Sequence, residues 1–118
     1  MSETTTWQGS CHCGRIAFEV AGTPDHVMEC NCSICRRKAA KMWFVPRTQL
    51  HLSTPEADMA TYTFNAHRIR HRFCPVCGIH VFGEAEKDGI PMAAINVRCL
   101  EGIDPDALPV RHFDGRSL

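Results

Sequence analysis

Cysteine spacing is the feature of this sequence that most limits what the chain can fold into. Seven of the eight cysteines lie in three short clusters, and neighbouring cysteines within a cluster are only one or two residues apart. Thiolates at such spacings can hold one metal ion from a tight turn, as in structural zinc sites built from cysteine alone. The pattern therefore predicts a small zinc protein. The clusters are Cys11 with Cys13, Cys30 with Cys32 and Cys35, and Cys74 with Cys77, while Cys99 stands alone.

The compartment decides whether these cysteines bind metal or form disulfides. Residues 1–7 are polar and rich in threonine, with no apolar stretch of the kind found in a signal peptide. We therefore expect a cytoplasmic protein, in which thiols stay reduced and closely spaced cysteines bind metal. A secreted disulfide scaffold is the weaker alternative.

Charge and hydropathy argue against two classes of partner. Lysine plus arginine and aspartate plus glutamate number 13 each, so the formal net charge is +0. Because binding to phosphate backbones depends on excess positive charge, the net charge argues against a nucleic-acid adaptor that uses residues 36–41 and 68–72. No apolar run approaches the roughly 20 residues that span a bilayer, so we expect no membrane partner.

Ligand counting divides the clusters between two sites. A structural zinc site needs four protein ligands, so the pair at residues 74–77 must recruit a second pair. The pair at residues 11–13 completes it, and a glycine follows each pair, Gly14 and Gly78, where such a turn often needs a positive φ. The trio at residues 30–35 then has three thiolates and an open fourth position, as catalytic zinc sites do.

Two closed sites are the alternative to this division. Cys99 or a histidine would then be the fourth ligand of the trio. Otherwise Cys99 is expected to be a buried bystander thiol, because free cysteine behaves as a small hydrophobic residue.

Alternating apolar and polar residues predict short β-strands along most of the chain. In residues 15–20, Ile16, Phe18 and Val20 share one face, which is the period of a half-buried strand. A helix is predicted only at residues 33–41, with Ser33 as its N-cap. The pattern indicates one all-β domain, residues 1–118, made of small sheets that zinc staples together. Further strands are predicted at residues 26–31, 42–45, 49–53, 59–64, 68–73, 80–84 and 92–97.

Histidines and arginines form a second set of candidates. His12 and His80 adjoin predicted zinc ligands and could hydrogen-bond to them. The predicted strand at residues 68–73 carries three arginines on one face, opposite His67 and His71. We interpret this arginine face as a solvated surface in preference to a carboxylate-binding or phosphate-binding one.

A basic run directly follows the trio and interleaves with aromatic residues. Its position suggests that it anchors an anionic substrate near the metal, and Trp43 and Arg47 are our candidates for substrate contact. The basic residues are Arg36, Arg37, Lys38, Lys41 and Arg47, and the aromatic ones are Trp43 and Phe44.

Three linked motifs resemble one known family across residues 7–113. They read GSCHCGRI at residues 9–16, CNCSICR at residues 30–36 and FCPVCG at residues 73–78. Together they resemble the glutathione-dependent formaldehyde-activating enzymes, a family that also includes centromere protein V. The resemblance implies a β-tent fold of small antiparallel sheets. It also implies a structural zinc on Cys11, Cys13, Cys74 and Cys77 and an active-site zinc on Cys30, Cys32 and Cys35.

The resemblance further implies a reaction and its participants. Glutathione would add to formaldehyde to give S-hydroxymethylglutathione, with zinc keeping the thiol sulfur deprotonated. We therefore expect a zinc-dependent, carbon–sulfur lyase-like enzyme with two zincs per chain, a small thiol, glutathione, as co-substrate, and an aldehyde as the second substrate. A thiol-binding carrier or a zinc interaction module without catalysis is the alternative.

Overall fold

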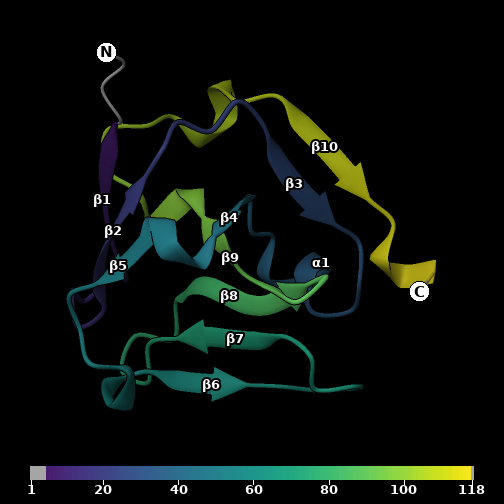
Figure 1. Ribbon diagram of the computed structural model, residues 1–118, viewed down its shortest axis with the longest axis horizontal. Helices are drawn as coiled ribbons and strands as arrows, with labels where there is room; N and C mark the ends of the chain where they lie inside the picture. The colour runs from purple at the N-terminus through teal and green to yellow at the C-terminus, as the bar shows by residue number, and fades with distance from the viewer. Residues whose placement is uncertain (1–4, 118) are drawn as a thin grey trace.

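The computed structural model describes residues 5–117, so most of the polar N-terminal segment discussed above and the last residue lie outside the described residues. The chain forms a three-stranded sheet of order β1-β2-β5 and a seven-stranded sheet of order β10-β3-β4-β9-β8-β7-β6. Figure 1 shows the small sheet standing at one side of the large one, with the single helix α1 beside β8 and near the end of β3.

The elements are short, as the frequent prolines and glycines require. The strands are β1 (Thr6–Ser10), β2 (Ala17–Ala21), β3 (Val27–Cys30), β4 (Met42–Pro46), β5 (Leu50–Leu52), β6 (Ala60–Tyr62), β7 (Arg70–Phe73), β8 (His80–Lys87), β9 (Ile90–Asn96) and β10 (Val110–Phe113). The helix α1 is Cys35–Lys38, and 3₁₀ turns lie at Arg47–Gln49, Glu56–Asp58, Val97–Cys99, Pro105–Ala107 and Gly115–Ser117.

The core lies where the two sheets meet. Ile16, Phe18 and Val20 are at most 1% exposed, which confirms the face predicted for this strand. Phe18 of the small sheet meets Phe82 of the large sheet edge to face, with ring centroids 6.3 Å apart. The Phe18 ring also lies directly on Gly9 of β1, where any added side chain would collide with it. Packing of Phe18 on Phe82 therefore joins the two sheets, while Gly9 leaves room for the Phe18 ring within the small sheet.

A buried carboxylate organises the arginines at one end of the large sheet. Glu84 accepts hydrogen bonds from Arg47 and Arg72, both at 2.8 Å, and Arg70 lies 3.8 Å away. Arg72 also pairs with Glu56 at 2.9 Å. Burial alone would raise the pKa of Glu84, but the hydrogen bonds and charges of Arg47 and Arg72 outweigh it and hold that pKa below its usual value. The expected solvated arginine face is wrong for Arg72, because this guanidinium belongs to an ion-pair network.

The structure bears out the expected all-β fold and changes several details. β1 and β10 were not predicted, because Thr6–Ser10 lacks an alternating apolar face and Val110–Phe113 is mostly exposed. β10 pairs with β3 in parallel, whereas all other strand pairs of the described residues are antiparallel. The predicted helix at residues 33–41 is only one turn long, and Ser33 does not cap it. Within residues 5–117, no helix has the length and apolar character needed to cross a bilayer.

Candidate metal centre and substrate groove

Four cysteines from distant parts of the chain converge at the first cluster. The ligand atoms of Cys11, Cys13, Cys74 and Cys77 all lie within 4.8 Å of one another. The sulfur of Cys13 is 3.7 Å from that of Cys11 and 3.6 Å from that of Cys74. A tetrahedral zinc with bonds of about 2.3 Å places its sulfurs about 3.8 Å apart, so the spacing fits the metal.

Backbone turns hold these sulfurs and point amide groups at them. The amide of Gly78 donates to the carbonyl of Cys74 at 2.9 Å, and Gly78 has φ +78°. Gly14 follows the other pair with φ +83°, so both glycines take the left-handed conformation that the sequence predicted for them. The amides of Val76 and Cys77 both donate to the sulfur of Cys74 at 3.4 Å. Such N–H···S contacts favour the charged thiolate, which is the form that binds metal.

This four-cysteine site spans the two sheets. Cys11 and Cys13 lie in the turn between β1 and β2 of the small sheet, and Cys74 and Cys77 in the turn between β7 and β8 of the large one. Cys74 is completely buried and Cys11 is 3% exposed. A metal here would cross-link segments that are 61 residues apart in the chain.

The second cluster is local and has three members. Cys30 ends β3, Cys32 lies in the connecting loop and Cys35 begins α1. Their sulfurs lie within 4.8 Å of one another, and the amide of Cys32 donates to the sulfur of Cys30 at 3.4 Å. Among the described residues, no fourth cysteine, histidine or carboxylate completes the set. Three soft thiolates with one unfilled position match the ligand chemistry of an open zinc site.

Cys99 is not the missing ligand. Its thiol donates to the carbonyl of His80 at 3.6 Å. Burial, followed by the charges of Cys11 and Cys77, raises the pKa of Cys99 to about 11, so Cys99 lies on the side of the four-cysteine site. In the structure this thiol is a partly buried neighbour of that site and a member of neither cluster.

A lysine and two histidines adjoin the trio. Lys38 donates from Nζ to Nδ1 of His71 at 3.1 Å and to Nε2 of His80 at 3.2 Å. Burial, followed by the charge of Lys38, lowers the pKa of His71 to about 4, and the same two causes with His71 added lower that of His80 to about 3. Both rings are therefore neutral at pH 7 and accept from the lysine. We expected His80 to hydrogen-bond to a ligand of the four-cysteine site, but its ring instead contacts Lys38 beside the trio.

The C-terminal segment walls one side of the trio. The backbone of Phe113 accepts from the amide of Asn31 at 3.2 Å, and the Asn31 side chain bonds to Asp114 at 2.9 Å and accepts from the amide of Arg116 at 2.8 Å. These bonds bring Gly115 so close to Cys30 that an added Cβ would lie 2.6 Å from its sulfur. The sequence had no signal for this wall, because Asn31 and Gly115 are 84 residues apart.

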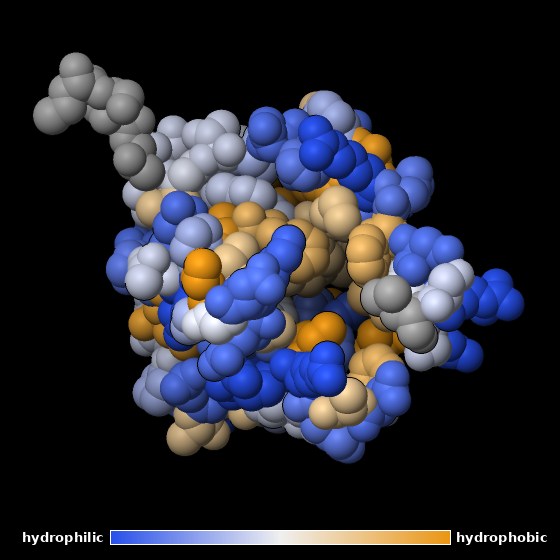
Figure 2. Space-filling view, turned by 45° about the vertical axis from the view of Figure 1, so that its right-hand side comes forward, coloured by the Kyte–Doolittle hydropathy of each residue, from blue (hydrophilic) through white to orange (hydrophobic). Residues whose placement is uncertain are grey.

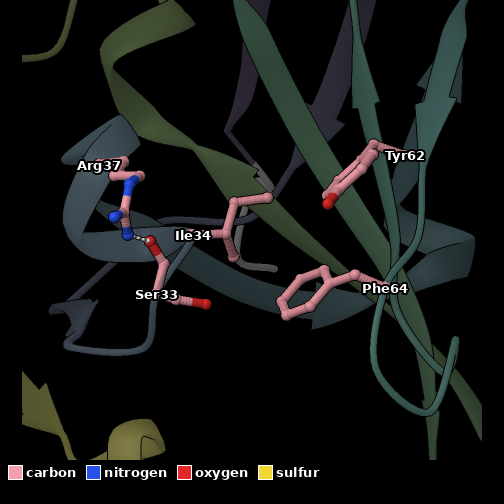
Figure 3. A pocket seen from close by; sticks show the side chains of 5 residues that line it. All are labelled: Ser33, Ile34, Arg37, Tyr62 and Phe64. Carbon is pink, nitrogen blue, oxygen red and sulfur yellow. Dashed lines mark hydrogen bonds between the residues drawn. The ribbon is translucent and has the colours of Figure 1, made fainter.

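A groove of about 340 Å³ lies beside the trio. Figure 3 shows Ile34 facing Tyr62 and Phe64 across it, while Arg37 donates to the carbonyl of Ser33 on the helix side at 2.7 Å. Tyr62 and Phe64 stack with ring centroids 5.7 Å apart. Figure 2 shows hydrophobic surface gathered around a hollow on the face turned toward the C-terminal end, with hydrophilic residues around it. The groove thus offers apolar walls and one guanidinium.

Trp43 and Arg47, the two predicted substrate contacts, are not brought to the trio. Trp43 is 9% exposed in the core and packs on Gly22. Arg47 bonds to Glu84 and to the carbonyl of Leu50. Arg47 begins the 3₁₀ turn after β4, five residues beyond Met42 at the start of that strand, which is about 16 Å of extended chain. Nearness in sequence was the only reason to choose these two residues.

The basic run after the trio disperses in the fold. Lys41 is buried and pairs with Asp106 at 3.1 Å, and Arg36 is exposed. Only Arg37 and Lys38 lie beside the trio and its groove. The aromatic residues that do line the groove, Tyr62 and Phe64, come from a distant hairpin, so spacing along the chain could not single them out.

Comparison with known proteins gives one consistent family. The sequence model of "GFA: Glutathione-dependent formaldehyde-activating enzyme" matches residues 6–113. A Colletotrichum graminicola protein named "Putative glutathione-dependent formaldehyde-activating enzyme" is 31% identical over 83 residues, which cover 65% of this chain and 43% of that protein. The chain thus matches less than half the length of this relative. A crystal structure of a Rhodobacter sphaeroides protein superposes with a TM-score of 0.75 at 29% identity, covering 88% of this chain and 99% of that one.

Proposed function

Because the chain belongs to the glutathione-dependent formaldehyde-activating enzyme family, we propose that it is a zinc-dependent, carbon–sulfur lyase-like enzyme that joins a small thiol, glutathione, to formaldehyde. The observation that carries the proposal is the asymmetry of the two cysteine clusters. One has four sulfurs and is complete, and the other has three, with no further ligand among the described residues. Closed zinc sites are structural, whereas catalytic sites keep one position for substrate or water.

The residues present fit zinc at both clusters. Cys11, Cys13, Cys74 and Cys77 would hold the structural ion, and Cys30, Cys32 and Cys35 the ion of the active site. Zinc bound to the trio would supply Lewis acidity that keeps an added thiol deprotonated near neutral pH.

The groove beside the trio supplies the remaining contacts. Its volume of about 340 Å³ lies at the lower end of the range for small-molecule sites. The guanidinium of Arg37 can pair with a carboxylate of glutathione, and Ile34, Tyr62 and Phe64 can pack against its aliphatic parts. This arrangement would direct the thiol of the tripeptide toward the three cysteines.

The bond changes are those of a simple addition. The thiol sulfur forms a bond to the carbonyl carbon of formaldehyde, the carbonyl π bond opens, and the proton lost by the thiol ends on the oxygen. The product is S-hydroxymethylglutathione, and nothing is oxidised or reduced. Gly115, in the wall formed by residues 113–117, lies against the sulfur of Cys30 and covers one side of the trio.

A carrier that binds the thiol without chemistry is the second candidate, because an open three-thiolate site suffices for binding. We also propose that residues 1–118 act as one domain and that the protein works in a reducing compartment such as the cytoplasm. Thiolate ligands that are partly exposed, such as Cys32, would otherwise oxidise.

The test begins with zinc and thiols counted under reducing conditions. We expect two zincs per chain, of which a chelator removes one faster, and that ion should be lost first in the Cys32→Ser variant. Calorimetric titration with glutathione and a formaldehyde-consumption assay then separate the two candidates. Glutathione binding with consumption supports the enzyme, and binding without consumption supports the carrier. A gel shift with nucleic acid that weakens with salt would instead support the nucleic-acid adaptor.

A further inference from the structure

Lys38 is a cation beside the three-cysteine cluster without a carboxylate partner. It lies one helical turn after Cys35 in α1 (Cys35–Lys38), so both side chains leave the same face of the helix. Within residues 5–117, no carboxylate lies within ion-pair distance of its Nζ atom. The nearby Lys41, by contrast, pairs with Asp106 at 3.1 Å. A half-buried lysine needs some compensation for its lost hydration.

Two neutral rings fix this lysine without neutralising it. Nζ contacts Nδ1 of His71 in β7 and Nε2 of His80 in β8, and both rings lie against each other with centroids 6.0 Å apart. His71 is itself packed on Phe64 and Tyr62 of the groove wall. An ammonium group has three N–H donors, so two are used by the imidazoles and one remains.

The only negative groups that face Lys38 in the described residues are the cysteines. Burial lowers the pKa of Lys38, and the charges of Cys35, Cys32 and Cys30 oppose this. Lys38 and Cys35 lie one turn apart on the same face of α1, and opposite charges at this spacing attract each other. The lysine and the trio therefore favour each other's charged forms.

We propose that Lys38, held by His71 and His80, is the anion-binding group of the three-cysteine site. It stabilises the negative charge of the metal-bound thiolates and offers its remaining N–H to the anionic atom that a substrate places at the open position. This inference rests on the zinc assignment of the proposed function. Three thiolates around Zn²⁺ carry one net negative charge and a fourth thiolate makes two, so a fixed cation is needed most when the substrate thiol binds.

A rival role for the same residues predicts the opposite change in zinc affinity when Lys38 is removed. If a histidine of this cluster were the fourth zinc ligand, Lys38 would compete for its lone pair. Removing Lys38 would then leave zinc binding unchanged or make it tighter, whereas a charge-balancing lysine makes zinc binding weaker when it is lost.

The experiment measures zinc affinity of the trio by competition with a chromophoric chelator in the full chain. Lys38→Met should weaken the more labile zinc about 10- to 100-fold, the usual effect of losing a partner that contacts metal ligands. Lys38→Arg, which keeps the charge and donors, should stay within about threefold of the wild type. Arg36→Met removes one charge from the same helical turn at an exposed position and should change nothing. The binding of glutathione, titrated into zinc-loaded protein, should fall in Lys38→Met as well.

His71→Phe tests whether His71 holds Lys38 in place, and it does so without leaving a cavity that could unfold the domain. It keeps an aromatic ring against Phe64 and Tyr62 but removes the acceptor for Lys38, so zinc affinity should fall by less than in Lys38→Met. In every variant the tighter zinc must remain, which shows that the domain is folded. Wild-type zinc affinity in Lys38→Met, or an equal loss in Arg36→Met, overturns the proposal. The proposed enzyme fails separately, if zinc-loaded wild type binds glutathione but does not consume formaldehyde.

Discussion

Replacing one cysteine from each cluster should have unequal effects, because the two sites close loops of very different length. Cys13 and Cys74 are 61 residues apart and come from different sheets. A cross-link over that distance removes about 4 kcal/mol of chain entropy from the unfolded state, and one over the few residues of the trio removes about 2 kcal/mol. Zinc binding at a structural site adds on the order of 10 kcal/mol to folding.

These magnitudes predict that two serine variants differ in folding stability. Cys74 is completely buried, so Cys74→Ser loses a ligand at the centre of the closed site and should cost at least about 4 kcal/mol. A domain of this size is stable by only about 5–15 kcal/mol in total, so the variant should be unfolded or melt at least about 15 °C lower. Cys32→Ser should keep the fold, lose one zinc and lose turnover.

Thermal unfolding followed by circular dichroism, together with zinc counting, measures both effects. Cys99→Ser is the matched control, because Cys99 is a partly buried thiol next to the closed site but not a member of it. It should retain two zincs and melt close to the wild type. Equal destabilisation by Cys74→Ser and Cys32→Ser would refute the separate structural and functional roles.

Two further substitutions test other parts of the structure. Glu84→Gln removes the buried negative charge that pairs with the partly buried Arg47 and Arg72, and it should cost about 3 kcal/mol, or about 10 °C in melting temperature, while both zincs stay bound. Glu86→Gln, at an exposed position of the same strand, is the control, and a shift below about 3 °C in Glu84→Gln would contradict the ion-pair network. Gly115→Ala places a methyl group 2.6 Å from the sulfur of Cys30 and should speed zinc loss from the trio without lowering the melting temperature; the control is Ser117→Ala in the same turn, and unchanged chelation kinetics in Gly115→Ala would show that the C-terminal wall is not packed on the trio.

Some features of the fold follow from local chemistry and were predictable from the sequence. The buried face formed by Ile16 and by Phe18 and Val20 of β2 could be predicted, because side chains alternate along a strand whatever it pairs with. The turns at Gly14 and Gly78 were predictable for a similar reason. Two closely spaced cysteines followed by a glycine are typical of a metal-binding turn, whatever the rest of the chain does. Edge strands such as β1 carried no alternating signal and were missed.

The sequence alone predicted which cysteines gather into each of the two clusters, because four-coordinate zinc and the grouping of the cysteines allow few divisions. Only the tertiary structure decided what surrounds the ligands. It buried Trp43, tied Arg47 to Glu84, and brought His71 and His80 from a different hairpin to Lys38. The physical reason is that ligand spacing is a property of a few consecutive residues, whereas charge compensation and groove walls depend on strand register across the large sheet.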